Sequence, residues 1–114
     1  MISGAHVIIY STDAEADRAF IRDGLGMDNV DAGGGWLIFK LPPSELAFHP
    51  ADNNGATEFY LMCDDVGAEI ARLAAMGRAC EPISEQRWGR LTKILLPGGG
   101  KLAMYQPLHA TAHG

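Results

Sequence analysis

Short apolar runs alternate with polar, glycine-rich or proline-rich stretches along the whole chain. The first run, 6–10, contains β-branched and aromatic residues and predicts a buried strand. The stretch 13–23 has helical spacing and ends at a glycine, Gly24. Thr12 is the predicted N-cap of this helix, with Glu15 reaching back to form a capping box.

Two further runs complete the first half of the chain. The segment 36–41 and the segment 45–49 both predict strands, and they are separated by a turn at Pro42 and Pro43. A polar loop at 53–55 then divides the chain, because Asn and Gly favour turns over regular structure.

The second half repeats the order of the first. A strand is predicted at 58–63, and a helix follows that is capped by Asp64 or Asp65 and ends at Gly77. The helix carries an apolar stripe, and two more strands are predicted at 91–96 and 101–105. The stripe consists of Val66, Ile70, Leu73 and Met76.

The two halves therefore form an internal repeat. Trp36 and Trp88 lie 52 positions apart, as do His6 and Glu58. We expect one α+β domain over residues 1–114, built from two tandem β-α-β-β-β modules at about 4–51 and 56–107, with a tail at 108–114. Neither half is long enough to close a core alone, so the sheets are expected to curl around a shared cavity.

The net charge and the composition argue against some classes of binding partner. The formal net charge is −5, which argues against nucleic acid and against an acidic membrane surface. No signal peptide or membrane span is predicted. Cys63 and Cys80 lack metal or redox spacing, so we expect two reduced cysteines in a cytoplasmic protein.

Four short motifs, in this order, resemble the vicinal-oxygen-chelate superfamily, which includes glyoxalases, bleomycin-resistance proteins and extradiol dioxygenases. The motifs are Gly4-Ala5-His6 at the first strand, 45–50 closing the first half, 58–65 opening the second, and 95–100 running into 105–107. One scaffold of this kind hosts many activities, so the resemblance predicts the fold more narrowly than the function.

The resemblance implies a divalent metal, such as Fe, Mn, Ni or Zn, held by the first and last strands of each half. The first-strand positions fall on His6 and Glu58. The last-strand position of the first half falls on Glu45 or Ala47. Strand alternation adds His49 as a candidate ligand on the same face. In the second half the ligand position falls on or beside Ala103, which has no donor atom. Each candidate ligand has an alternative interpretation, because His and Glu are also common as solvent-exposed residues at strand ends and in turns.

Aromatic residues are the candidates for contact with a ligand. Trp36, Tyr60, Trp88 and Tyr105 could line the cavity, or could serve only in packing. Tyr105 is also a candidate catalytic hydrogen-bond donor or general acid, and Glu58 is the second candidate catalytic residue.

Three functions fit this pattern. The first is a metal-dependent dioxygenase, lyase or isomerase whose metal chelates two neighbouring substrate oxygens. The alternative is a metal-free protein that binds a drug or another aromatic small molecule, as bleomycin-resistance proteins do. A purely structural or partner-binding role is the third. The resemblance also implies a homodimer.

Overall fold

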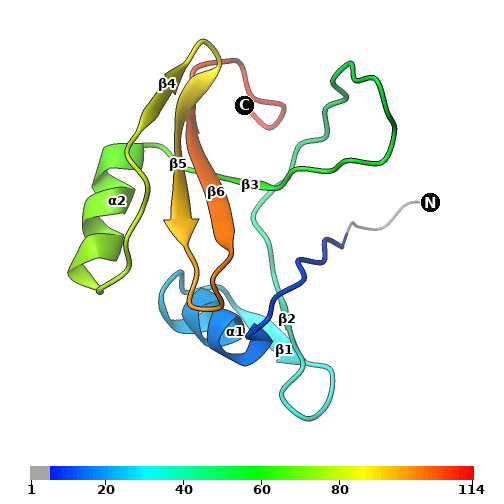
Figure 1. Cartoon of the computed structure of the whole chain (residues 1–114), viewed down its shortest axis with the longest axis vertical. Helices are drawn as coiled ribbons and strands as arrows, with labels where there is room; N and C mark the ends of the chain where they lie inside the picture. The colour runs from blue at the N-terminus through cyan, green and yellow to red at the C-terminus, as the bar shows by residue number, and fades with distance from the viewer. Residues whose placement is uncertain (1–5) are drawn as a thin grey trace.

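The computed structural model describes residues 6–114, so Gly4 and Ala5 of the first motif lie outside the described range. The described chain is an α+β fold with two helices and mixed sheets, as the sequence predicts (Figure 1). Its elements in chain order are α1 (Ala14–Asp23), β1 (Asn29–Asp31), β2 (Leu37–Phe39), β3 (Tyr60–Met62), α2 (Val66–Ala75), β4 (Ser84–Gln86), β5 (Gly89–Leu95) and β6 (Lys101–Pro107).

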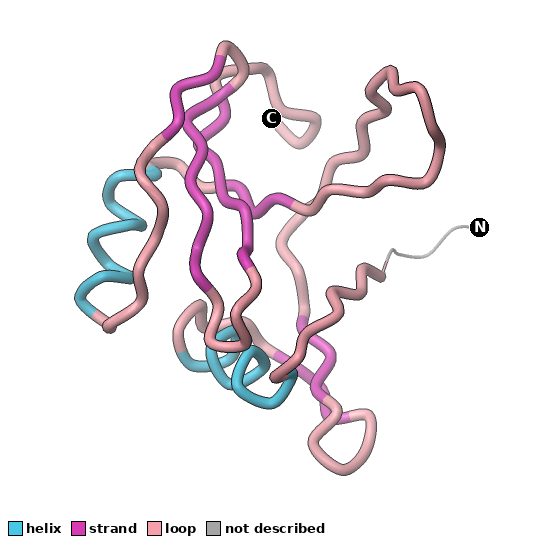
Figure 2. Tube along the Cα trace, in the orientation of Figure 1, coloured by secondary structure: helices cyan, strands magenta, loops and turns pink. Residues whose placement is uncertain are grey.

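The second half forms a four-stranded sheet in the order β3-β6-β5-β4. β5 runs antiparallel to both β4 and β6, whereas β3 runs parallel to β6. Figure 2 shows the two long central strands with α2 beside them. The parallel pair needs a crossover, and α2 together with β4 and β5 supplies it.

The hydrophobic core lies between this sheet and α2. Val66 and Leu73 of α2 are fully buried, as is Ile94 of β5. Leu102 and Met104 of β6 are also buried against this cluster. The predicted stripe on α2 is thus confirmed for its first three members, whereas Met76 at the C-cap is 51% exposed.

Both helices have an aspartate as their N-cap residue. The Asp13 carboxylate accepts a hydrogen bond from the Ala16 backbone N–H at 3.1 Å, and Asp65 does the same for Ala68 at 3.0 Å. The prediction that Thr12 caps α1 was wrong. Its hydroxyl instead donates to the Gly98 carbonyl oxygen at 2.9 Å, across 86 positions of sequence.

A partly buried polar link joins the first helix to the turn between β5 and β6. Asp17 accepts hydrogen bonds from the Gly98 N–H at 2.8 Å and from the Ser11 hydroxyl at 2.6 Å. A Cβ at Gly98 would lie 2.6 Å from Ser11 Oγ, so a side chain does not fit there. Figure 1 shows α1 next to this turn. The link therefore fixes the first half against the second.

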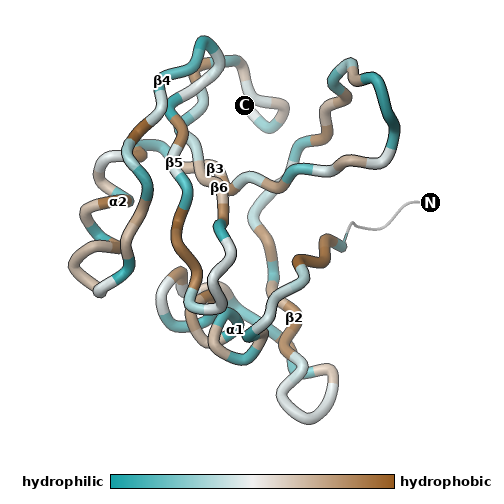
Figure 3. Tube along the Cα trace, in the orientation of Figure 1, coloured by the Kyte–Doolittle hydropathy of each residue, from teal (hydrophilic) through white to brown (hydrophobic). Residues whose placement is uncertain are grey.

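The first half is less complete than the second. Its described strands form only the β1–β2 hairpin, and the predicted strands 6–10 and 45–49 are not strands here. Nothing in the described chain pairs with these segments, so their side chains stay in contact with solvent. Tyr10 is 92% exposed and Phe48 is 90% exposed. Figure 3 colours part of the first segment as strongly hydrophobic.

Two short strands were not predicted from the sequence. β1 and β4 are each three residues long and entirely exposed, so neither carries the apolar alternation that marks a strand. They occupy corresponding places in the two halves, after α1 and after α2. The described strands belong to two separate sheets.

Candidate functional site

The sheet of the second half has one face covered by α2 and one open face. Side chains alternate along a strand, so the burial of Leu102 and Met104 sends Ala103 and Tyr105 to the opposite face. The pairing register brings Tyr60 opposite Ala103 and Met62 opposite Tyr105. Tyr105 therefore faces away from Leu102 and Met104.

Three aromatic rings meet on this open face. Tyr60 comes from β3, Tyr105 from β6, and Trp88 from the turn between β4 and β5. The ring centroids lie 5.7 Å apart for Tyr60 and Tyr105, 5.2 Å for Trp88 and Tyr105, and 6.1 Å for Tyr60 and Trp88. All three pairs meet edge to face, which is a favourable geometry for aromatic rings. These three rings are called the aromatic cluster below.

Gly89 makes room for the aromatic cluster. It is buried at the start of β5, directly opposite Pro107 in the register. A Cβ at this position would lie 2.7 Å from both the Tyr105 ring and the Gln106 carbonyl oxygen. The absence of a side chain therefore lets the Tyr105 ring lie close over the neighbouring strand.

The pKa values of both tyrosines in the aromatic cluster are raised above the ordinary value. The Tyr60 hydroxyl donates to Glu58 Oε2 at 2.7 Å, and this hydrogen bond, with some burial, raises the pKa of Tyr60 to about 12. Burial and the charge of Glu45 raise the pKa of Tyr105. Both hydroxyls are thus neutral donors at physiological pH, and two carboxylates lie in their electrostatic surroundings.

The C-terminal tail adds a residue that the sequence did not single out. Tyr105 and His109 are hydrogen-bonded through the phenol oxygen and Nε2 at 2.9 Å. Their rings are tilted by 31° with centroids 5.9 Å apart. Residues after 107 resemble a frayed terminus in sequence, and only the spacing of four between Tyr105 and His109 hints at a contact.

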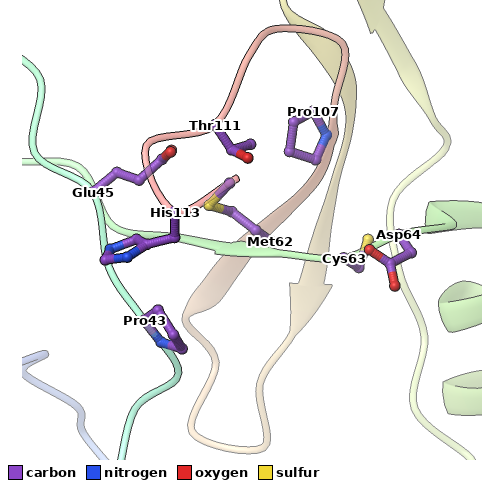
Figure 4. Close-up of a pocket in the computed structure, with 8 residues that line it drawn as sticks. All are labelled: Pro43, Glu45, Met62, Cys63, Asp64, Pro107, Thr111 and His113. Atoms are coloured by element: carbon purple, nitrogen blue, oxygen red, sulfur yellow. The ribbon is translucent and has the colours of Figure 1, made fainter.

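A pocket of about 220 Å³ lies between the tail, the end of β3 and the segment 43–45. Figure 4 shows Glu45 and His113 on one side of it and Cys63 and Asp64 on the other. Glu45 accepts a hydrogen bond from the Ala112 backbone N–H. One wall is therefore a contact between the first half and the tail.

The four candidate metal ligands do not gather in a single chain. His6, Glu45, His49 and Glu58 are all exposed, and residues 6–114 contain no group of three or more His, Cys, Asp or Glu side chains placed to hold a metal ion. Ala103 pairs with Tyr60 on one side and with Lys93 on the other, so the open face offers no carboxylate there. Within the described part of one chain, these side chains therefore do not form a site for a divalent metal.

Trp36 lies apart from the aromatic cluster. It is 64% exposed near the start of β2, and the Arg18 guanidinium lies 4.6 Å from its ring centroid. This is the geometry of a cation–π contact. Of the predicted ligand-contacting aromatics, the structure brings together Tyr60, Trp88 and Tyr105, and places Trp36 elsewhere.

Cys63 and Cys80 are both free. Burial is the main reason that the pKa of the Cys63 thiol rises to about 11, and burial also raises the pKa of Cys80. Both are therefore protonated thiols and poor nucleophiles at neutral pH. Among the described residues, neither helix is long and apolar enough to cross a membrane.

Several solved structures are similar to this chain over most of its length. An antibiotic-binding protein, TnmS3 from Streptomyces sp. CB03234, is 24% identical, with a TM-score of 0.63 over 94% of this chain and 99% of its own. A lactoylglutathione lyase from Agrobacterium tumefaciens is 22% identical, with a TM-score of 0.64 over 91% of this chain and 92% of its own. A glyoxalase/bleomycin resistance protein from Streptomyces sp. CB03234 is also 22% identical, with a TM-score of 0.52 over 84% and 93% of the two chains.

No protein-family model and no curated protein matches the sequence. The structural similarity nevertheless covers nearly the full length, so the chain has the vicinal-oxygen-chelate fold that its sequence resembles. At 24% identity or less the similarity establishes the fold and leaves the activity open, because this fold carries both enzymes and binding proteins.

The link between Glu58 and Tyr60 gives a prediction about pH. Replacement of Glu58 by Gln removes the charged acceptor, so the pKa of Tyr60 should fall from about 12 toward its ordinary value of 10.0. An ultraviolet titration of tyrosinate absorbance, with Tyr60→Phe to assign the signal, measures the change.

The sign of the effect on stability follows from the raised pKa. The folded protein holds the Tyr60 proton more tightly than the unfolded chain. The contribution of the Tyr60 hydroxyl to the free energy of unfolding is therefore complete below about pH 10 and is lost as pH rises toward 12. An unchanged titration in Glu58→Gln would show that the carboxylate does not govern this phenol.

Proposed function

We propose that this protein binds a flat, positively charged aromatic small molecule against the open face of its second sheet, without a metal. The observation that carries this proposal is the aromatic cluster of Tyr60, Trp88 and Tyr105 on a face that α2 does not cover. Trp88 is 40% exposed, so its ring surface is open to a partner. Rigid aromatic side chains offer a large contact area at little cost in conformational entropy.

Two carboxylates near the aromatic cluster favour a cationic ligand. Glu58 is hydrogen-bonded to Tyr60, and the charge of Glu45 acts on Tyr105. A cation over an aromatic ring is attracted to the π face, and a nearby carboxylate adds to that attraction. Tyr105 and Glu58 thus act in ligand positioning in this proposal, as a hydrogen-bonding group and as a charge partner.

The metal-dependent enzyme predicted from the sequence needs His6 and Glu58 to converge with either His49 or Glu45. In one chain they do not, and Ala103 stands near the position where the resemblance implies a carboxylate. The similar antibiotic-binding protein has the same fold, so a binding role is compatible with this scaffold. For these reasons we favour binding over catalysis.

The proposal includes a homodimer. In the second half, β3 pairs with β6, and the repeat makes 6–10 and 45–49 their counterparts in the first half. These two segments have no partner in the described chain, yet they expose large apolar side chains. Exposed apolar surface of this kind marks an interaction site, and a second copy of the chain carries the matching unpaired segments. The exposed residues are Val7, Ile8, Ile9, Tyr10, Leu46 and Phe48.

Ligand binding is tested with two flat fluorescent probes of opposite charge, ethidium and 1-anilinonaphthalene-8-sulfonate. We expect metal-stripped protein to bind ethidium more tightly than the anionic probe. Replacement of Tyr60 or Trp88 by Leu should each weaken ethidium binding about two- to tenfold, which corresponds to roughly 0.5–1.5 kcal/mol for one aromatic contact. Trp36→Leu is the matched control and should leave the affinity unchanged.

The same protein should be titrated with iron, manganese, nickel and zinc. Ethidium binding that does not depend on Tyr60 and Trp88 would contradict the proposed face. Stoichiometric metal uptake that is lost in both His6→Ala and Glu58→Ala would instead establish the chelating enzyme.

The dimer is tested by sedimentation equilibrium. We expect the wild type to be dimeric at micromolar concentration, and Ile8→Asp or Phe48→Asp to shift it toward monomer, because each places a charge on a buried apolar contact. Met76→Asp, an exposed position at the C-cap of α2, is the control and should stay dimeric. A monomeric wild type would contradict this part of the proposal.

A further inference from the structure

The C-terminal tail, residues 108–114, is held at both of its ends although it carries no regular secondary structure. At its start, His109 contacts Tyr105 of the aromatic cluster. Near its end, Ala112 donates to Glu45, and His113 Nε2 is hydrogen-bonded to the Ser44 carbonyl oxygen at 2.8 Å. The tail thus crosses from the second half to the first over the pocket of Figure 4.

The hydrogen bonds of His109 define its role. Its Nδ1 lies 2.8 Å from the Ala110 carbonyl oxygen, which can only accept, so Nδ1 carries a hydrogen. In the neutral ring Nε2 is then the acceptor, and the Tyr105 hydroxyl donates to it. The imidazole therefore accepts the hydrogen bond that the Tyr105 hydroxyl could otherwise donate to a ligand.

The ring geometry makes the same point. Tyr60 and Trp88 meet the Tyr105 ring at 79° and 75°, whereas His109 meets it at 31°. The imidazole is thus tilted at the hydroxyl end of the Tyr105 ring, with the centroids 5.9 Å apart. A flat ligand that approaches the Tyr105 hydroxyl therefore meets the imidazole first.

We propose that the tail is an autoinhibitory strap, in which His109 holds the Tyr105 hydroxyl and lies beside its ring until an aromatic ligand displaces it. This inference rests on the proposed function, because it assumes that the aromatic cluster binds the ligand. The contacts of Ala112 and His113 with 44–45 hold the strap in place. A strap that is closed for roughly nine-tenths of the time lowers the apparent affinity about tenfold.

The first test measures ethidium binding to three tail variants. Deletion of residues 109–114 and His109→Ala should each tighten binding, by about tenfold for the deletion. His109→Phe is the matched control: it keeps a ring beside Tyr105, so its affinity should stay closer to that of the wild type than to that of His109→Ala. His113→Ala loosens one anchor and should fall between the wild type and the deletion.

The second test needs no ligand. Nitration by tetranitromethane, mapped by mass spectrometry, reports the access to each tyrosine of the chain, which are Tyr10, Tyr60 and Tyr105. Tyr105 should react several-fold faster in the deletion and in His109→Ala, whereas the rate at Tyr10 should not change.

The outcomes separate the two proposals. Unchanged nitration of Tyr105, or ethidium affinity that stays equal or falls on deletion, overturns the strap while the binding function stands. Faster nitration with no ethidium binding by any form supports the contact between His109 and Tyr105 and overturns the function. Faster nitration together with tighter binding supports both.

Discussion

Strict alternation of side chains along β6 is the constraint on which the rest of the structure depends. Leu102 and Met104 are buried against α2, and this places Ala103 and Tyr105 on the other face. The register with β3 then sets Tyr60 opposite Ala103, and the short turn into β5 brings Trp88 to the same place. A shift of one residue in this register would exchange the core and the open face. One ladder of strands therefore determines both the stability of the second half and the chemistry of its surface.

The two halves share an order of elements but differ in how complete they are. The second half closes a core around Leu73 and Ile94, whereas the first half leaves apolar residues such as Ile8 and Phe48 in contact with solvent. Asp17 and Thr12 tie the first half to the turn at Gly98, so α1 keeps a defined place although the segments 6–10 and 45–49 lack a strand partner. The exposed apolar segments of the first half are the basis of the proposed dimer. The uncovered aromatic face of the second half is the basis of the proposed binding function.

The sequence predicted what depends on local periodicity and missed what depends on contacts between distant segments. The helices, β5 and β6 follow from apolar spacing, and the facing of Tyr105 follows from parity alone. β1 and β4 were missed because three exposed residues carry no pattern. Thr12 was assigned as a cap because its bond to Gly98 spans 86 positions, which no local motif reveals. The predicted strands 6–10 and 45–49 have the right composition, but a strand also needs a neighbour to pair with. His109 was missed since its partner is fixed only when the tail folds back.

The most direct test of the central claim is a ring-carbon NMR spectrum of protein labelled at tyrosine, recorded while a flat cationic ligand such as ethidium is added. The chain has three tyrosines, so each signal can be assigned with one Phe variant apiece. If the ligand stacks on the open face of the second sheet, the signals of Tyr60 and Tyr105 will shift together in proportion to occupancy. Saturating ligand that leaves both signals unmoved would place the binding site elsewhere and contradict the account.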